Sequence, residues 1–145
     1  MRKKGFTLVE LLVVIAIIGL LSTLAVVALN SARQKSRDAK RVADIKQIQT
    51  ALELFFNDQN GYPVAAAGGT LGVGGFGCLG TGGWAATGCG GPYMSLVPTN
   101  PTPSGSSYIY TAATNASYTI TFNLEAATGG LGSGNKTASP GGITD

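Results

Sequence analysis

The feature that most constrains this chain is an apolar run of 24 residues, Phe6–Leu29, which carries one charged side chain, Glu10. As an α-helix, this run would be roughly 36 Å long, which exceeds the roughly 30 Å hydrocarbon core of a bilayer. A cleavable secretory signal fits less well, because its apolar core is about 7–15 residues long and ends at a small-residue site. We therefore expect residues 6–29 to form a membrane-spanning helix.

The helical pattern continues through residues 30–60, where apolar residues recur every three or four positions and form one stripe. The stripe consists of Val42, Ile45, Ile48, Leu52 and Phe55. No proline interrupts residues 6–60, and Gly61 followed by Pro63 is typical of a left-handed cap and a stop. We expect one helix of roughly 50 residues with an amphipathic second half at 30–60.

Charged residues of the second half fit a solvated helix surface. This interpretation covers the basic residues Arg33, Arg37, Lys40 and Arg41 and the acidic residues Asp38, Asp44 and Glu53.

Two β-rich segments, residues 107–112 and 117–125, predict an antiparallel hairpin or sheet at about 108–127. In the second segment, apolar residues alternate with Thr and Asn, so one face should be buried. We expect that face to pack on the apolar stripe of residues 30–60. The predicted fold class is therefore α+β, with one long N-terminal helix and a small antiparallel sheet on its C-terminal half.

The rest of the chain is rich in small and polar residues. Residues 61–107 predict a Gly-rich loop region, and a connector of this length is often where function or variability resides. Residues 128–145 are of low complexity and predict a mobile tail, or a surface strand at most.

Composition argues against several classes of function. Arg2, Lys3 and Lys4 account for the whole net charge of +3, so nucleic-acid binding is possible but unsupported. The chain has no histidine, and no nucleophile with a base can be assembled from its few charged residues. We expect no enzyme activity, no cofactor and no metal site.

Three short patterns remain. Cys78 and Cys89 predict one disulfide if this segment is exported, and two free thiols are the alternative. Residues 72–77 match GxGxxG, but no strand before it or helix after it is evident, so nucleotide binding is not indicated. Asn115 and Asn135 begin N-x-[ST] tripeptides, which arise often by chance.

Glu10 has two interpretations that are compatible. In the first, Thr7 and Glu10 form an S/T-x-x-E capping box, in which Glu10 accepts a hydrogen bond from the helix start. In the second, the carboxylate pairs with a positive charge, because an ionised group in a spanning helix is costly when unpaired. A cut between Gly5 and Phe6 would create such a charge, the α-amino group of Phe6.

The basic start, Gly5, Phe6, Thr7, Leu8, Glu10 and the following apolar run resemble the class III signal of type IV pilins and type II secretion pseudopilins. The stretch ALELFFNDQNGYP also resembles the end of the long helix in this family. The resemblance covers about the first 30 residues well.

This resemblance implies a process. A prepilin peptidase would cleave the leader, residues 1–5, after Gly5 and usually methylate the amine of Phe6. An assembly ATPase and a platform protein would then drive subunits from the membrane into a helical homopolymer with the apolar helices in its core. Glu10 would pair with the Phe6 amine of a neighbouring copy. The precursor would be a single-pass cytoplasmic-membrane protein with a cytoplasmic N-terminus, and the product an extracellular filament.

The chain departs from the family at two places. Many members have a proline about two-thirds of the way along the apolar helix, where this chain has Val27 or its neighbours. Any local melting on assembly would therefore depend on Gly19. The calcium site of the major pseudopilin needs acidic residues near the C-terminus, where this chain has only Glu125 and Asp145, so we predict no such site. We expect a type IV pilin-like structural subunit. The alternatives are a secretion pseudopilin and a membrane-anchored surface protein that does not polymerise.

Overall fold

The structure is a computed structural model and describes residues 5–145. The basic residues of the predicted leader, Arg2, Lys3 and Lys4, lie outside the described residues. The chain divides into two compact units, residues 1–34 and 35–145, which are described separately below. The helix α1 (Leu8–Gln59) contributes residues to both units. The later elements are β1 (Ala65–Thr70), the 3₁₀ helix η1 (Gly74–Phe76), β2 (Cys78–Gly80), β3 (Gly83–Ala85), β4 (Ile109–Thr114), β5 (Ser117–Leu124), β6 (Gly134–Ser139) and β7 (Gly142–Thr144).

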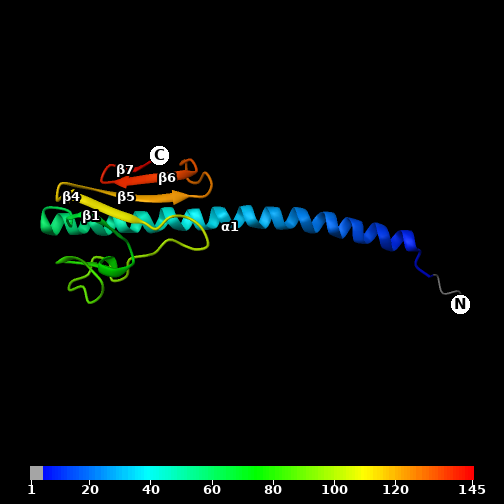
Figure 1. Cartoon of the computed structure of the whole chain (residues 1–145), viewed down its shortest axis with the longest axis horizontal. Coiled ribbons are helices and arrows are strands. Elements are labelled where there is room, and N and C mark those ends of the chain that lie inside the picture. The colour runs from blue at the N-terminus through cyan, green and yellow to red at the C-terminus, as the bar shows by residue number, and fades with distance from the viewer. Residues whose placement is uncertain (1–4) are drawn as a thin grey trace. The chain divides into compact units, whose positions relative to one another are not determined.

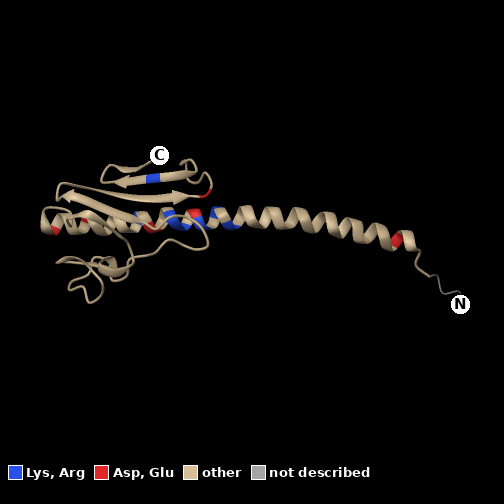
Figure 2. Ribbon diagram, in the orientation of Figure 1, with Lys and Arg blue, Asp and Glu red and all other residues tan. Residues whose placement is uncertain are grey.

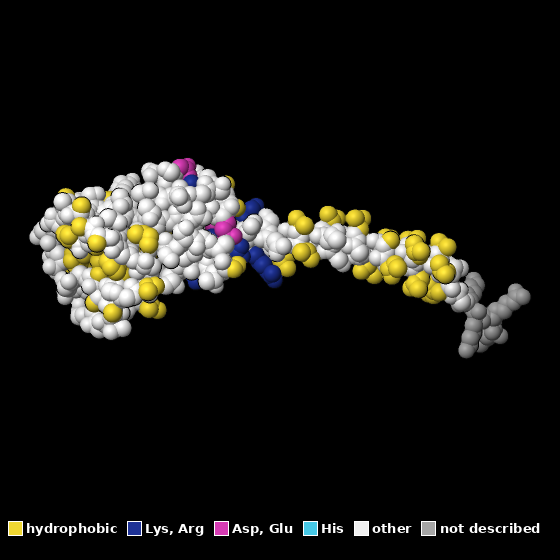
Figure 3. Space-filling model, viewed as in Figure 1, with side chains coloured by type: hydrophobic (Ala, Val, Ile, Leu, Met, Phe, Trp, Pro, Cys, Tyr) yellow, Lys and Arg dark blue, Asp and Glu magenta, His cyan; other side chains and the backbone are white. Residues whose placement is uncertain are grey.

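The first unit contains the apolar part of α1. Its large apolar side chains are exposed along its length, from Leu8 at 78% to Leu29 at 51%. Hydrophobic side chains are spread along the visible face of this helix (Figure 3). By length and composition, α1 is able to cross a membrane, and its most apolar window has a mean hydropathy of 2.9. The prediction of one continuous helix at about residues 6–60 is confirmed by the observed span, Leu8–Gln59.

The end of α1 differs in detail from the prediction. The residue in the left-handed region is Asn60, with φ 55°, and not Gly61. Asparagine tolerates this conformation better than most residues with a side chain. Gly61 serves a different purpose, because a Cβ there would lie 2.8 Å from the side chain of Asn115. The adjacent N–H of Tyr62 donates to the Asn115 carbonyl at 2.8 Å, which fixes the exit of the chain from the helix.

The second unit contains a five-stranded antiparallel sheet with the order β1-β4-β5-β6-β7. The hairpin β4–β5 is at its centre, with Tyr110 opposite Ile120. In Figure 1, strands β4, β5 and β6 run beside the part of α1 that belongs to this unit. The α+β prediction is therefore confirmed, and the predicted hairpin is the middle of a larger sheet.

The core lies between the sheet and residues 35–59 of α1. In β5 the residues alternate between buried and more exposed positions, as the sequence predicted. Alternation with period two places the apolar set on one face of the sheet. The buried residues from the two sides include Tyr118, Ile120, Phe122 and Leu124 of β5 and Ile45, Ile48, Leu52 and Phe55 of α1.

The region 61–107, predicted to be loop, contains strand β1 at one edge of the sheet. Its sequence, AAAGGT, has little intrinsic β propensity, so pairing with β4 and tertiary packing determine its structure. A Cβ at Gly69 would lie 1.8 Å from the ring of Phe76, so this glycine allows the aromatic side chain to cover the strand. The segment predicted as a Gly-rich loop region thus contains a strand at residues 65–70.

The C-terminal residues 128–145, predicted to be a mobile tail or at most a surface strand, form both β6 and β7. Strand β6 pairs with β5 over five residue pairs, and β7 pairs with β6. Strand β6 could not be predicted from composition, because its two buried residues are Lys136 and Ala138, neither of which is a large apolar residue. Lys136 is buried, and its ammonium reaches the Asp145 carboxylate at 2.6 Å, which compensates for the lost hydration of the charge.

A small lobe holds the two cysteines. Strands β2 and β3 form a separate two-stranded sheet, and Cys78 is joined to Cys89 by a disulfide with a Cα–Cα distance of 6.1 Å. In the chain-entropy model, closing so short a loop contributes about 3 kcal/mol. The disulfide therefore stabilises a segment that has only short strands of its own.

Candidate functional site

The residues predicted to be processed lie just before α1. Phe6 is 86% exposed, and a Cβ built on Gly5 meets no atom within 4 Å. Both residues are thus accessible on the N-terminal side of the helix start. Cleavage after Gly5 and methylation of Phe6 stay predictions.

The predicted capping box between Thr7 and Glu10 is confirmed. The Thr7 N–H and the Thr7 hydroxyl both donate to Glu10 Oε2, at 2.8 and 2.7 Å, and the Glu10 N–H donates to Thr7 Oγ1 at 3.2 Å. These bonds satisfy backbone donors that have no partner within the helix. The box uses no atom of residues 1–5, so removal of a leader at Gly5 would leave it intact.

Glu10 is exposed, and its capping bonds engage only one carboxylate oxygen. The hydrogen bonds shown among residues 5–145 leave Oε1 available. The carboxylate can therefore cap its own helix through Oε2 and accept from an external cation through Oε1. The two interpretations of Glu10 do not compete for the same atom.

The polar side chains in the middle of the apolar run are satisfied within the helix. The Ser22 hydroxyl donates to the Ile18 carbonyl at 2.7 Å, and the Thr23 hydroxyl donates to the Leu20 carbonyl at 2.8 Å. Such bonds let hydroxyl groups enter an apolar environment without an unpaired donor. The helix from Leu11 to Leu29 therefore presents an essentially apolar surface.

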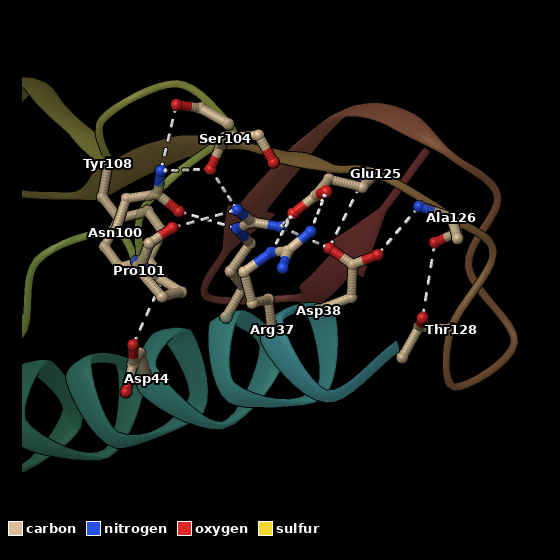
Figure 4. Close-up of polar contacts among 12 residues, drawn as sticks. Arg37, Asp38, Asp44, Asn100, Pro101, Ser104, Tyr108, Glu125, Ala126 and Thr128 are labelled. Carbon is tan, nitrogen blue, oxygen red and sulfur yellow. Dashed lines mark hydrogen bonds and ion pairs between the residues drawn. The ribbon is translucent and has the colours of Figure 1, made fainter. Parts of the chain in front are cut away.

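A buried polar cluster in the second unit was not predicted from the sequence. Its centre is Arg41, which is completely buried although its spacing on the helix suggested a solvated surface. The guanidinium donates five hydrogen bonds (Figure 4), to Asp38 Oδ1 at 2.6 Å, Glu125 Oε1 at 2.6 Å, Asn100 Oδ1 at 2.7 Å, the Pro101 carbonyl at 3.2 Å and the Ser104 carbonyl. Arg41 thus ties α1 to the end of β5 and to the loop that precedes β4.

The other members of the cluster complete these ties. Asp38 is also fully buried, and its carboxylate accepts the backbone N–H groups of Glu125 and Ala126 at 3.0 and 2.8 Å. Arg37 holds Glu125 with two hydrogen bonds of 2.8 and 2.6 Å. Hydrogen bonding from Arg37, with Arg41 adding to it, holds the pKa of Glu125 far below its usual range. The prediction that Asp38 is a surface charge was therefore wrong.

Asp44 is a second buried acid that the sequence placed on the surface. It is 6% exposed, and the hydroxyl of Tyr108 donates to its carboxylate at 3.2 Å. Burial raises the pKa of Asp44, and burial beside Asp44 raises the pKa of Tyr108. The third predicted surface acid, Glu53, is exposed and accepts a hydrogen bond from Tyr62 at 2.8 Å.

The acids considered for a calcium site are each engaged by a cation. Glu125 pairs with Arg37 and Arg41, and Asp145 pairs with Lys136. Within residues 5–145, no group of three or more His, Cys, Asp or Glu side chains is placed to hold a metal ion. The absence of a calcium site stays a prediction of the sequence.

The GxGxxG match lies in a turn. Strand β1 precedes the motif, contrary to the prediction, but the three-residue helix η1 lies within it and strand β2 follows it. A dinucleotide fingerprint requires a longer helix whose N-terminus receives the phosphates. These glycines instead support tight turns, with φ 78° at Gly72 and 54° at Gly74.

Comparison with known proteins links the N-terminal region to a family. A family model described as the prokaryotic N-terminal methylation motif matches residues 1–26. The type II secretion system core protein G of Aeromonas hydrophila is 40% identical over 67 residues, which are 46% of this chain and 47% of that protein. The core protein G of Escherichia coli strain K12 is 39% identical over 67 residues, 46% of each chain.

The chain is also similar to a type IV pilin. The type IV major pilin protein PilA of Myxococcus xanthus is 34% identical over 61 residues, which are 42% of this chain and 28% of that protein. The chain thus spans about half the length, or less, of these curated relatives. No solved structure matches the chain significantly.

Proposed function

We propose that this chain, which belongs to the type IV pilin and type II secretion pseudopilin family, is a structural subunit that polymerises through its N-terminal helix into a type IV pilus-like filament. Members of this family are structural proteins, which confirms the prediction that the chain is not an enzyme.

The observation that carries the proposal is the exposed apolar surface of residues 8–29. Of these 22 positions, 15 carry large apolar side chains, and each of these side chains is about half exposed or more. Soluble monomers rarely leave such a surface uncovered, because burying apolar area is strongly favourable in water. Lipid would cover it in the precursor, and the same helices of other copies would cover it in a filament.

Glu10 gives the proposed assembly a polar contact. The α-amino group of Phe6 exists only after cleavage at Gly5, and in the filament it would donate to the free Oε1 of Glu10 on a neighbouring copy. A buried carboxylate without its partner is costly, so packing in the wrong axial register would be penalised. Thr7 would retain its bonds to Oε2 throughout.

The proposal includes a pathway and its partners. Before assembly, the precursor would cross the cytoplasmic membrane once with its N-terminus inside. A prepilin peptidase would process it at Gly5 and Phe6, and an assembly ATPase with a platform protein would transfer it into the filament on the cell surface. The residues after 29 would then lie outside the cytoplasm, where the Cys78–Cys89 disulfide would be stable.

A secretion pseudopilin is the second candidate. It is favoured by the name of the relatives from Aeromonas hydrophila and Escherichia coli, which are type II secretion system core proteins. Both candidates require the same processing and the same polymerising helix. They differ in the product, because a pseudopilin would support protein secretion, and its deletion would block release of exported enzymes without removing surface filaments.

Three variants separate the two roles of Glu10 in an assembly assay. Glu10→Ala loses both roles, and Glu10→Gln keeps a capping acceptor but loses the charge. Thr7→Ala loses the two capping bonds of the hydroxyl but keeps the backbone N–H bond and the charge. Each variant would be co-expressed with wild type, and its share of the sheared filaments would be measured against its share in the membrane.

We expect Glu10→Ala and Glu10→Gln to be processed but nearly excluded from filaments, and Thr7→Ala to be incorporated. Normal incorporation of Glu10→Gln would leave Glu10 with its capping role alone. Recovery of only full-length wild-type monomer from membranes, with no filament, would support the non-polymerising surface protein instead.

A further inference from the structure

Among the described residues, the outer face of the sheet in the second unit has no charged side chain without an ion-pair partner. From Tyr62 to the C-terminus, the charged residues are Glu125, Lys136 and Asp145. All three are already ion-paired, Glu125 with the arginines of α1 and Lys136 with Asp145. Figure 2 shows that charged residues of this unit gather on α1 and are sparse on the strands. Surfaces of small soluble domains usually have roughly 25–35% charged residues, so this face is unusually neutral.

Side chains with hydroxyl or amide groups replace charge on this face. The register places Ile109 opposite Thr121, Thr121 opposite Thr137, and Thr137 opposite Thr144, so one row crosses four strands. With strands about 4.8 Å apart, the row is roughly 14 Å long. Neighbouring rows pair Thr111 with Thr119 and Asn123 with Asn135.

A hollow of about 300 Å³ lies on this face. Its lining consists of Ser106, Ser107, Ile109, Thr121, Phe122, Asn135, Lys136 and Thr137. The one charged member, Lys136, is buried and has its ammonium paired with Asp145. The side-chain hydrogen bonds that the structure shows here join Asn123 to Asn135 at 3.0 Å and Thr144 to the Thr137 carbonyl at 3.4 Å. The hydroxyls of Ser106, Ser107, Thr121 and Thr137 are left for solvent or a ligand.

We propose that this threonine-rich sheet face, with the hollow as its central subsite, binds a neutral polysaccharide. The chemistry of the face selects this partner. A charged polymer would lose its hydration without gaining an opposite charge, whereas the hydroxyl groups of a neutral sugar can both donate to and accept from Ser and Thr. Ile109 offers an apolar contact for the C–H face of a sugar ring. The inference does not depend on whether the chain polymerises.

The test is a depletion isotherm of the full chain with insoluble neutral polysaccharides, namely cellulose, chitin and cross-linked dextran. The chain would be kept in a polyoxyethylene detergent, because detergents with sugar headgroups would compete. The double variant Thr121→Val, Thr137→Val removes two hydroxyls and keeps the β-branched shape that strands favour. Thr50→Val removes one exposed hydroxyl from α1 and is the matched control. Trp84 fluorescence checks that each variant is folded.

Wild type and Thr50→Val should be retained on at least one of the three polysaccharides, and the double variant should bind about tenfold more weakly, as expected for two ordinary hydrogen bonds. Retention should be unchanged at about 0.5 M salt, because no ion pair is involved. Lack of retention on all three, equal binding of the double variant, or elution by salt would overturn the proposal. The amount of each protein that sediments without polysaccharide is measured in parallel and subtracted, because copies can associate through the exposed apolar residues 8–29.

Discussion

Replacing Arg41 by methionine should destabilise the second unit more than any other change of a charged residue in the chain. Methionine keeps much of the length of the arginine stem but donates no hydrogen bond. Arg41 is completely buried and donates to two carboxylates, one side-chain amide and two backbone carbonyls. All these acceptors would lose a partner at a site that is buried or partly buried.

The size of the loss follows from what each acceptor retains. Removing one partner of a buried ion pair generally costs about 3–5 kcal/mol, because the other charge is left uncompensated. Asp38 would still accept two backbone N–H groups, and Glu125 would still accept both bonds from Arg37. We therefore expect a loss near the lower end, about 3 kcal/mol, together with release of the loop that contains Asn100.

The assay is denaturant unfolding of the full chain in detergent, followed by the fluorescence of Trp84, the single tryptophan. Exposed Lys40, one residue earlier on α1, provides the control, and Lys40→Met should change stability by less than about 0.5 kcal/mol. Arg37→Met should lie between the two, because Glu125 keeps its bond to Arg41. A loss for Arg41→Met below about 1 kcal/mol would refute the role assigned to this cluster.

Three further predictions concern the same unit. Gly69→Ala should cost about 1–3 kcal/mol because its Cβ would meet Phe76, whereas Gly75→Ala, with open space around it, should be nearly neutral in the same unfolding assay. Arg37 and Arg41 hold the pKa of Glu125 below its usual 4.5, so the stability it contributes is complete above that pH and is lost as the pH falls below it. Glu125→Gln should lower stability at pH 6 and flatten this acid dependence, and an unchanged slope would contradict the assignment. Cys89→Ser should lower the free energy of unfolding by up to about 3 kcal/mol, and reduction of the disulfide in the wild type should cause a similar loss.

The sequence predicted the elements in which a single pattern dominates. The length of the apolar run, the stripe around Ile48 and the alternation in β5 each follow from one period, and the structure contains all three. The capping box at Thr7 was also predictable, because it depends on two residues at a fixed spacing.

The sequence did not predict features that depend on tertiary partners. Arg41 and Asp38 have the spacing of ordinary surface charges. Their burial depends on Glu125, which is distant in the sequence but contacts Arg41 in the folded chain. Strands β1 and β6 have weak propensity and acquire their structure from neighbouring strands. A long-range ion pair such as Arg37–Glu125 has no local signature in the chain.

The most direct measurement of the central proposal is mass spectrometry of the subunits in filaments sheared from cells. If the chain polymerises as proposed, its N-terminal peptide in the filament will begin at Phe6, carry a methyl group on the α-amine, and contain Glu10 unmodified. Detection of the chain only in membranes, with residues 1–5 still attached, would contradict the account.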